Sequence, residues 1–258
     1  MEKHESSKDR KSYGRIVLDH VYHRDPRGVR SLPPALDDPR YVVGGGADMR
    51  VTLGAFLELI LIIANIGTAV ALFPILKRVN EILALGYVTA RVVECAFIAV
   101  GVLSLLTVLT LRQEAAGADA GSLVAVGKSL VALHDWTFLL GPGFVVGIGN
   151  GLLLGYLMYR SGLVPRRMAA LALVGGPLIV ASGTAILFGV FEAGSAWQMI
   201  ATIPEFFWEL SIGIWLTIRG FNPSAVASLT ADTEKVGVTT GVNHPAVVPP
   251  NGHVASKV

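Results

Sequence analysis

The chain has 258 residues, of which 52% are apolar and only 16% are charged, and its mean hydropathy is +0.59. Soluble domains carry roughly 25% charged residues, so this composition indicates a membrane protein. The net charge of +2 is small and the basic residues form no patch interleaved with aromatic residues, which argues against nucleic-acid binding. The single cysteine, Cys95, excludes a disulfide within the chain and any multi-cysteine metal site.

The two ends of the chain are hydrophilic. Residues 1–50 contain ten Lys/Arg, eight Asp/Glu, four prolines and the triple glycine at 44–46, with no apolar segment of the kind found in a secretory signal. No apolar repeat at helical or strand spacing continues for long in this stretch, so we expect a mostly disordered N-terminal tail. Residues 221–258 are polar again and rich in proline, and we expect a second disordered tail there.

Five apolar runs lie between these tails, each about 20 residues long, which is the length that crosses a bilayer as a helix. They predict an all-α transmembrane domain over residues 51–220, a polytopic bundle of five helices. The predicted spans are Val51–Phe73, Gly86–Leu111, Trp136–Tyr159, Met168–Phe191 and Met199–Ile218.

The connections between the spans alternate in charge. The cation-rich loops follow the first and third spans, and they carry Lys77, Arg78, Arg160, Arg166 and Arg167. The loop 191–198, between the fourth and fifth spans, contains Glu192 and no cation. Because short loops rich in Lys and Arg stay in the cytoplasm, we expect the C-terminus inside and, with five spans, the N-terminus outside.

The fifth span carries two carboxylates, Glu205 and Glu209, four residues apart. Four residues is about one helical turn, so both side chains leave the same face of the helix. Lipid does not accept such a face, and other helices or a water-filled cavity must therefore cover it. The sequence thus predicts a bundle with a polar interior.

Further ionisable residues lie within or at the head of the spans. At about 1.5 Å of rise per residue, the acidic ones could form a column that runs inward from the outer surface, with one arginine at its foot. The four glutamates and the one guanidinium within the spans cannot all be paired, so a proton-linked pathway is one hypothesis. The other is a structural network, in which Arg91 pairs with Glu94 and neutral glutamic acids form hydrogen bonds between helices, and ordinary helix packing gives it the greater weight. The polar cluster consists of Glu58, Arg91, Glu94, His134, Asp135, Glu205 and Glu209.

The third predicted span contains a stripe of glycines at every fourth position. Small residues at this spacing let another helix approach closely, so helix packing is the expected role, within the chain or between copies of an oligomer. The polar residues Asn65 and Asn150 are expected to join helices by hydrogen bonds. The stripe is Gly143, Gly147, Gly151 and Gly155.

No motif in the sequence indicates an enzyme or a resident metal. The HExxH, GxSxG and P-loop patterns are absent, so we expect no catalytic residue, and catalysis is the less favoured class of function. His134 and Asp135 with Glu58 and Glu205 would offer mixed nitrogen and oxygen ligands, but their spacing is not diagnostic of a metal site. We therefore expect neither a metal nor a cofactor.

From about Tyr41 to Gly220 the chain resembles a bacterial membrane family described only as domain of unknown function 4386. The stretches that carry the resemblance, in order, are ALFPILKRVNEILALGYVTARVVECAFIAVG, HDWTFLLGPGF, GNGLLLGYLMYRSGLVPRR and IPEFFWELSIGIWLTIRGF. The resemblance implies a multi-pass protein of the bacterial cytoplasmic (inner) membrane. It also implies six helices, of which the first would precede GADMR, where residues 1–40 of this chain are hydrophilic.

Two classes of function remain open from the sequence. One is a small-solute or proton-linked carrier, with a small-molecule ligand of unknown identity, which needs carboxylates that water reaches and that titrate together. The other is a structural or partner-binding membrane protein, which needs the same groups paired and inert. The resemblance supplies no substrate or site residue that would decide between them, and the lipid bilayer is the one partner that we expect in either case.

Overall fold

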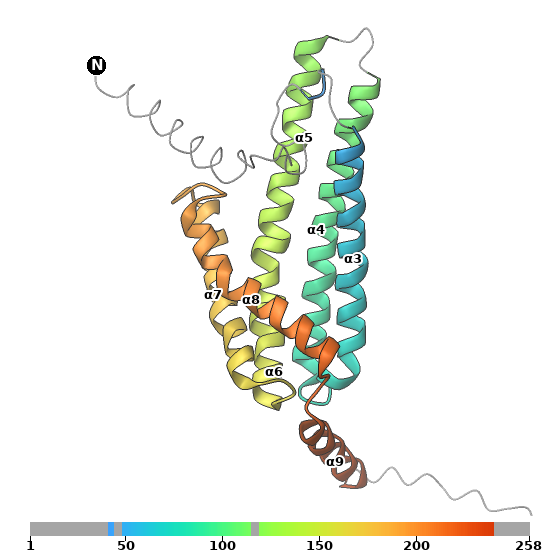
Figure 1. Ribbon diagram of the computed structural model, residues 1–258, viewed down its shortest axis with the longest axis vertical. Helices are drawn as coiled ribbons and strands as arrows, with labels where there is room; N and C mark the ends of the chain where they lie inside the picture. The colour runs from blue at the N-terminus through green and yellow to red at the C-terminus, as the bar shows by residue number, and fades with distance from the viewer. Residues whose placement is uncertain (1–40, 44–47, 115–118, 240–258) are drawn as a thin grey trace, which may run out of the picture.

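The computed structural model describes residues 41–43, 48–114 and 119–239, and over these residues the protein is all-α, as predicted (Figure 1). Five of its helices are long and apolar enough to cross a membrane. One of the five is a continuous helix, Ala120–Ser161, that changes its winding along its length. The helices are α3 (Asp48–Leu76), α4 (Glu81–Gln113), α5 (Ala120–Leu140), α6 (Gly155–Ser161), α7 (Arg166–Leu187), α8 (Ala196–Ile218) and α9 (Pro223–Thr239).

The helix ends follow from capping residues in the connections. The side chains of Asn80, Asp119 and Ser195 accept hydrogen bonds from backbone N–H groups in the first turns of α4, α5 and α8. Helix α7 ends at Leu187, earlier than the predicted Phe191, because Gly189 adopts a left-handed conformation with φ of 68° and donates its N–H to the carbonyl of Ile186.

The helix of the third predicted span is longer than predicted: it begins at Ala120, whereas the apolar run in the sequence predicts a start at Trp136. The cap explains the difference, since the Asp119 carboxylate accepts hydrogen bonds from both the N–H and the hydroxyl of Ser122, at 2.8 Å each. Lys128 and His134 interrupt the apolar run without breaking the helix, because neither residue type opposes helical geometry strongly.

The middle of the same helix is wound as a π-helix over Gly141–Val145 and again over Gly147–Leu154. We name these segments η1 and η2. A π turn closes i→i+5 hydrogen bonds and is wider than an α turn. Pro142, which lacks an N–H donor, and the surrounding glycines weaken the ordinary α-helical pattern at this point. The apolar run in the sequence predicts a regular α-helix here, and that prediction is wrong over η1 and η2.

The helices form two groups joined through η1 and η2. Helices α3, α4 and α5 run side by side, while α7 packs against α6 and η2, and α8 packs mainly on α7 (Figure 1). Helix α8 crosses the bundle obliquely in front of the other helices (Figure 1). This course brings its two glutamates, Glu205 and Glu209, to a cavity that α8 shares with α3 and α4.

The glycine stripe of the third span packs against α7. A Cβ atom on Gly147 would lie 2.7 Å from the carbonyl oxygen of Gly176, and one on Gly151 would lie 2.4 Å from the Gly176 Cα. Gly155 meets the side chain of Ala172 in the same way. Gly143 lies at the end of this contact, where its carbonyl oxygen approaches Gly183. Packing within the chain therefore accounts for Gly147, Gly151 and Gly155, as the sequence predicts for small residues at this spacing.

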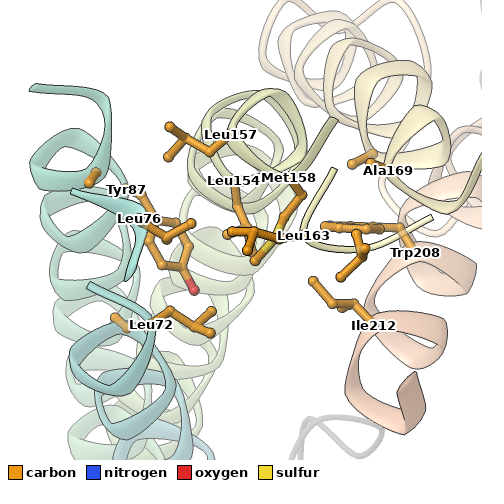
Figure 2. Packing of buried hydrophobic residues seen from close by; sticks show 14 of the residues in the cluster. Leu72, Leu76, Tyr87, Leu154, Leu157, Met158, Leu163, Ala169, Trp208 and Ile212 are labelled. Atoms are coloured by element: carbon orange, nitrogen blue, oxygen red, sulfur yellow. The ribbon is translucent and has the colours of Figure 1, made fainter. Parts of the chain in front are cut away.

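A large apolar cluster closes the bundle at the end that carries α9. In Figure 2, Leu154, Leu157 and Met158 lie between Tyr87 with Leu76 on one side and Trp208 with Ile212 on the other. Trp208 and Tyr87 are fully buried there. A Trp or Tyr ring of this kind buries on the order of 150–250 Å², so this cluster holds α8 to the remainder of the protein.

Both predicted tails contain folded residues. Residues 223–239 form α9, against the predicted disorder, because the Asn222 side chain accepts hydrogen bonds from the N–H and hydroxyl of Ser224, and Ala225 and Leu229 pack on the cluster of Figure 2. At the other end Tyr41 and Val42 are buried among residues of α3 and α4. The other residues of the predicted tails that lack a described structure are 1–40, 44–47 and 240–258.

Polar contacts hold the Tyr41 segment in place. The Tyr41 hydroxyl donates to Asp48 at 3.0 Å, Asp48 pairs with Arg112, and the Arg112 guanidinium lies 4.6 Å from the centre of the Tyr41 ring. Burial raises the pKa of the Tyr41 hydroxyl, and the hydrogen bond from Arg112 opposes that rise. The domain therefore begins before the predicted Val51.

Candidate functional site

A cavity of about 390 Å³ lies between α3, α4, η2 and α8. Its walls are partly apolar, with Leu72, Val146 and Ile179 among them. Polar side chains from four separate helical segments also reach it: Asn65, Tyr87, Arg91, Glu94, Asn150, Glu205 and Glu209. Four of the seven residues in the predicted polar cluster thus meet at one cavity.

Arg91, Glu94 and Asn65 form a closed ring of hydrogen bonds at this cavity. Arg91 Nη1 donates to Glu94 Oε2 at 2.7 Å, and Arg91 Nη2 donates to Asn65 Oδ1 at 2.8 Å. Asn65 Nδ2 donates in turn to Glu94 Oε1 at 3.2 Å. All three residues are buried, so the ring joins α3 to α4 and occupies the terminal nitrogens of the guanidinium.

Glu205 has a different environment. Its residue is 2% exposed, and neither carboxylate oxygen has a hydrogen-bond partner among the described residues. Glycines make room for it: a Cβ atom on Gly175 would lie 2.8 Å from Glu205 Oε2, and one on Gly151 would lie 3.0 Å away. A buried polar group without a partner costs free energy. Protonation of the Glu205 carboxylate, or a ligand that donates hydrogen bonds to it, would lower this cost.

Glu209 lies one turn further along α8 and is more accessible than Glu205. Its Oε1 accepts a hydrogen bond from Asn150 Nδ2 at 2.6 Å, while the Asn150 carbonyl accepts one from the Trp208 indole at 3.2 Å. The π-helical segment η2 therefore supplies two contacts to α8. No salt bridge joins Glu205 or Glu209 to a cation among the described residues.

Glu58 and His134 form a second, separate pair between α3 and α5. His134 Nε2 lies 3.3 Å from Glu58 Oε1, and the His134 ring stacks on Phe138 with centroids 4.6 Å apart. Gly101 of α4 gives this ring its space, since a Cβ there would lie 3.3 Å from His134 Cδ2. Neither Glu58 nor His134 lines the cavity.

The predicted single column of acidic groups is therefore divided into two clusters. Asp135 is exposed and lies 3.8 Å from His134 Nδ1, too far for a hydrogen bond. In the described part of the chain, no three His, Cys, Asp or Glu residues come together in a way that could hold a metal ion. Glu205, a candidate ligand beside His134 in the sequence analysis, instead faces the cavity.

Sequence reasoning missed Tyr87 as a residue of the cavity and gave Asn65 and Asn150 a packing role alone. Tyr87 precedes Arg91 by four residues, so helical spacing alone could have placed it on the same face. Its hydroxyl is buried without a partner among the described residues. No residue spacing in the sequence predicts the contact of Asn150 with Glu209, because this contact depends on the winding of η2 and on the oblique course of α8.

Comparison with known families gives one match. The family model described as domain of unknown function (DUF4386) matches residues 31–220, which is more than half of the chain. The chain belongs to the DUF4386 family. The match includes every helix that lines the cavity, and it begins before Tyr41, where the resemblance in the sequence started. Neither the curated proteins nor the solved structures include a match to this DUF4386 chain.

Proposed function

We propose that this DUF4386 protein is an integral membrane protein that carries a small solute, with Glu205 and Glu209 coupling the solute to protons. The observation that supports the proposal most is the pair of α8 carboxylates, which face a cavity and form no salt bridge within the described part of the chain. Their one cationic neighbour in the cavity, Arg91, is already bonded to Glu94 and Asn65.

Charge balance is the physical reason for this proposal. Glu94, Glu205 and Glu209 face the cavity with a single guanidinium, so full ionisation would leave two uncompensated negative charges there, one of them on the buried Glu205. A buried charge without compensation costs at least several kcal/mol. The carboxyls must therefore take up protons, or a ligand must bring positive charge. Exchange between these two states is the elementary step of a proton-linked carrier.

The proposed setting is the bacterial cytoplasmic membrane. The five apolar helices are long enough to span it, and the connections that carry Lys77, Arg78, Arg160, Arg166 and Arg167 lie at one end of the bundle, the end that also holds α9. The positive-inside rule assigns that end to the cytoplasm. With this orientation the Glu58–His134 pair belongs to the outer half of the protein and the cavity to its middle.

A solute-driven proton assay tests the proposal. The purified protein is reconstituted into liposomes that contain a pH-sensitive dye, and a panel of an organic amine, an amino acid, a carboxylate and a sugar is added outside. We expect at least one of these solutes to change the internal pH only when the protein is present. Glu209→Gln should abolish the response, because the amide keeps the hydrogen-bonding shape without the titratable proton.

Glu58→Gln is the matched control, since it makes the same chemical change on a carboxyl that does not line the cavity. It should leave the response in place. If the wild-type protein melts cooperatively but no solute on the panel moves protons or shifts the melting temperature, the carrier proposal is wrong.

The second candidate is a structural or partner-binding protein. The closed ring of Arg91, Glu94 and Asn65 favours it, because both oxygens of Glu94 and both terminal nitrogens of Arg91 have partners in the ring without a ligand. This candidate predicts that Glu209→Gln changes neither the proton response in liposomes nor the melting temperature. Glu209→Leu should lower the melting temperature, because leucine leaves the Asn150 amide without its acceptor.

A further inference from the structure

We infer that the cavity takes a protonated amine with an apolar body, which enters sideways between α3 and α8 from the hydrocarbon of the bilayer. This inference rests on the proposed function and names its class of ligand. Four features of the cavity support it: its mouth, its hydrogen-bond acceptors, its charge and its apolar walls.

The mouth of the cavity lies between α3 and α8. Its lining includes Leu61 on α3 and Phe206 on α8, which are 40% and 57% exposed, as well as the exposed residues Thr68 and Gly213. Helix α3 packs mainly on α4, and α8 packs mainly on α7, so the two rims belong to different parts of the bundle. Exposed apolar side chains in the middle of membrane-length helices face lipid, and the mouth therefore opens sideways.

The interior offers hydrogen-bond acceptors that have no donor. Both oxygens of Glu205 lack a partner among the described residues, in a side chain that is almost fully buried. Glu209 uses one oxygen for Asn150. An ionised carboxylate only accepts hydrogen bonds, so the missing partner must donate them. An ammonium group supplies three donors and the opposite charge in a volume small enough to lie beside two carboxylates one turn apart.

The charge of the cavity opposes an anionic ligand. The terminal nitrogens of Arg91 already donate to Glu94 and Asn65, so an incoming carboxylate or phosphate finds only Arg91 Nε without a partner among the described residues. It would also meet Glu205 and Glu209, and like charges in a medium of low dielectric repel strongly. The same arrangement attracts a cation, since the field of the α8 glutamates is not compensated.

The remaining walls suit an apolar body. Leu72, Val146, Leu154, Ile179 and Ile212 line the cavity beside the polar groups. A volume of about 390 Å³ falls within the range of small-ligand pockets, roughly 300–1,000 Å³. A ligand with a longer apolar tail would extend that tail through the mouth into the bilayer. The tail then lies in hydrocarbon, so leaving the cavity costs it no binding free energy.

The test compares alkylammonium ions with the matched 1-alkanols, using butyl, octyl and dodecyl chains. Binding to the full chain in lipid nanodiscs is measured by the shift in melting temperature and by titration, with protein-free nanodiscs correcting for partition into lipid. We expect octylammonium to bind at least tenfold more tightly than octanol. Dodecylammonium should bind at least as well as octylammonium, because its tail projects through the mouth.

Two variants locate the site. Glu205→Gln should weaken octylammonium binding at least tenfold and leave octanol unchanged, while Glu58→Gln should change neither. If Glu205→Gln does not fold, Glu209→Gln serves instead, since its amide oxygen still occupies the place of the carboxylate oxygen next to Asn150. Equal affinity for the ammonium ion and the alcohol would overturn recognition of a cation. Loss of binding between octyl and dodecyl would overturn entry from the bilayer.

The outcome separates the two proposals. If no ammonium ion binds but another solute drives proton movement in the liposome assay, the amine inference is wrong and the carrier proposal stands. If nothing binds and nothing moves protons, both are wrong.

Discussion

Replacing Gly151 with alanine tests whether the close approach of η2 and α7 holds the cavity in shape. The added Cβ would lie 2.4 Å from the Gly176 Cα and 3.0 Å from Glu205 Oε2. Carbon atoms pack at about 3.5–4.0 Å, so α7 would have to move away by about 1 Å. Overpacking of this kind costs about 1–3 kcal/mol, which exceeds the gain of about 1 kcal/mol that alanine brings to a helix. We therefore expect a net loss in the free energy of unfolding.

The measurement is a thermal melt of the purified protein, in which each kcal/mol shifts the midpoint by about 2–4 °C for a chain of this size. Gly67→Ala is the matched control, because nothing lies within 4 Å of its added Cβ and it should keep the helix gain. If Gly151→Ala were as stable as Gly67→Ala, the reasoning from the glycine contact would be refuted. A stable Gly151→Ala protein with altered amine binding would show that the Glu205 carboxylate had moved to make room for the added Cβ while α7 had stayed in place.

Three further predictions concern the ends of helices and the orientation of the bundle. Asp119→Ala should lower the melting temperature at pH 7 by removing the N-cap of α5. Hydrogen bonds from the first turn hold the pKa of Asp119 below its ordinary 3.8, so the difference in melting temperature from wild type should persist above pH 3.8 and shrink below it. A difference that does not depend on pH would contradict the role of Asp119 as a cap. Truncation after Asn222 should lower the melting temperature by uncovering the cluster against which Leu229 packs, whereas truncation after Thr239 should not; equal effects would show that α9 adds nothing. In a Cys95→Ala background, an impermeant thiol reagent on intact cells should label Ala193→Cys but not Lys77→Cys, and the reverse pattern would invert the orientation.

The helices that could span a membrane were predictable because the requirement is simple. A helix in lipid satisfies its own backbone hydrogen bonds and needs only an apolar surface, so run length and charge suffice to find it. The same logic fails where polar residues share a helix with an apolar face. Lys128 and His134 hid the first part of α5, and the polar serines and threonines of α9 hid a helix that packs through only a few apolar side chains.

The candidate site was predictable within a helix and much less so between helices. Spacing placed Glu205 with Glu209 and Arg91 near Glu94, because helical periodicity fixes such neighbours. Which residues meet across helices depends on crossing angles and winding. The pairing of Glu58 with His134, the ring through Asn65 and the contact of Asn150 with Glu209 all arise from packing that one sequence does not reveal.

The π-helical winding of η1 and η2 also determines what a single-residue deletion in this part of the helix does to the residues beyond it. Its wider turns fit more residues into the same rise than an α-helix does. A π turn holds one residue more than an α turn between flanks that keep their orientation. Deleting one residue from η2 would therefore restore an α turn and leave Gly155 against Ala172, while Asn150, which lies inside the segment, would move relative to Glu209. We expect such a deletion to keep the fold and to weaken the contact between η2 and α8, whereas an insertion into the regular α-helical part of α5 would turn everything beyond it by about 100°.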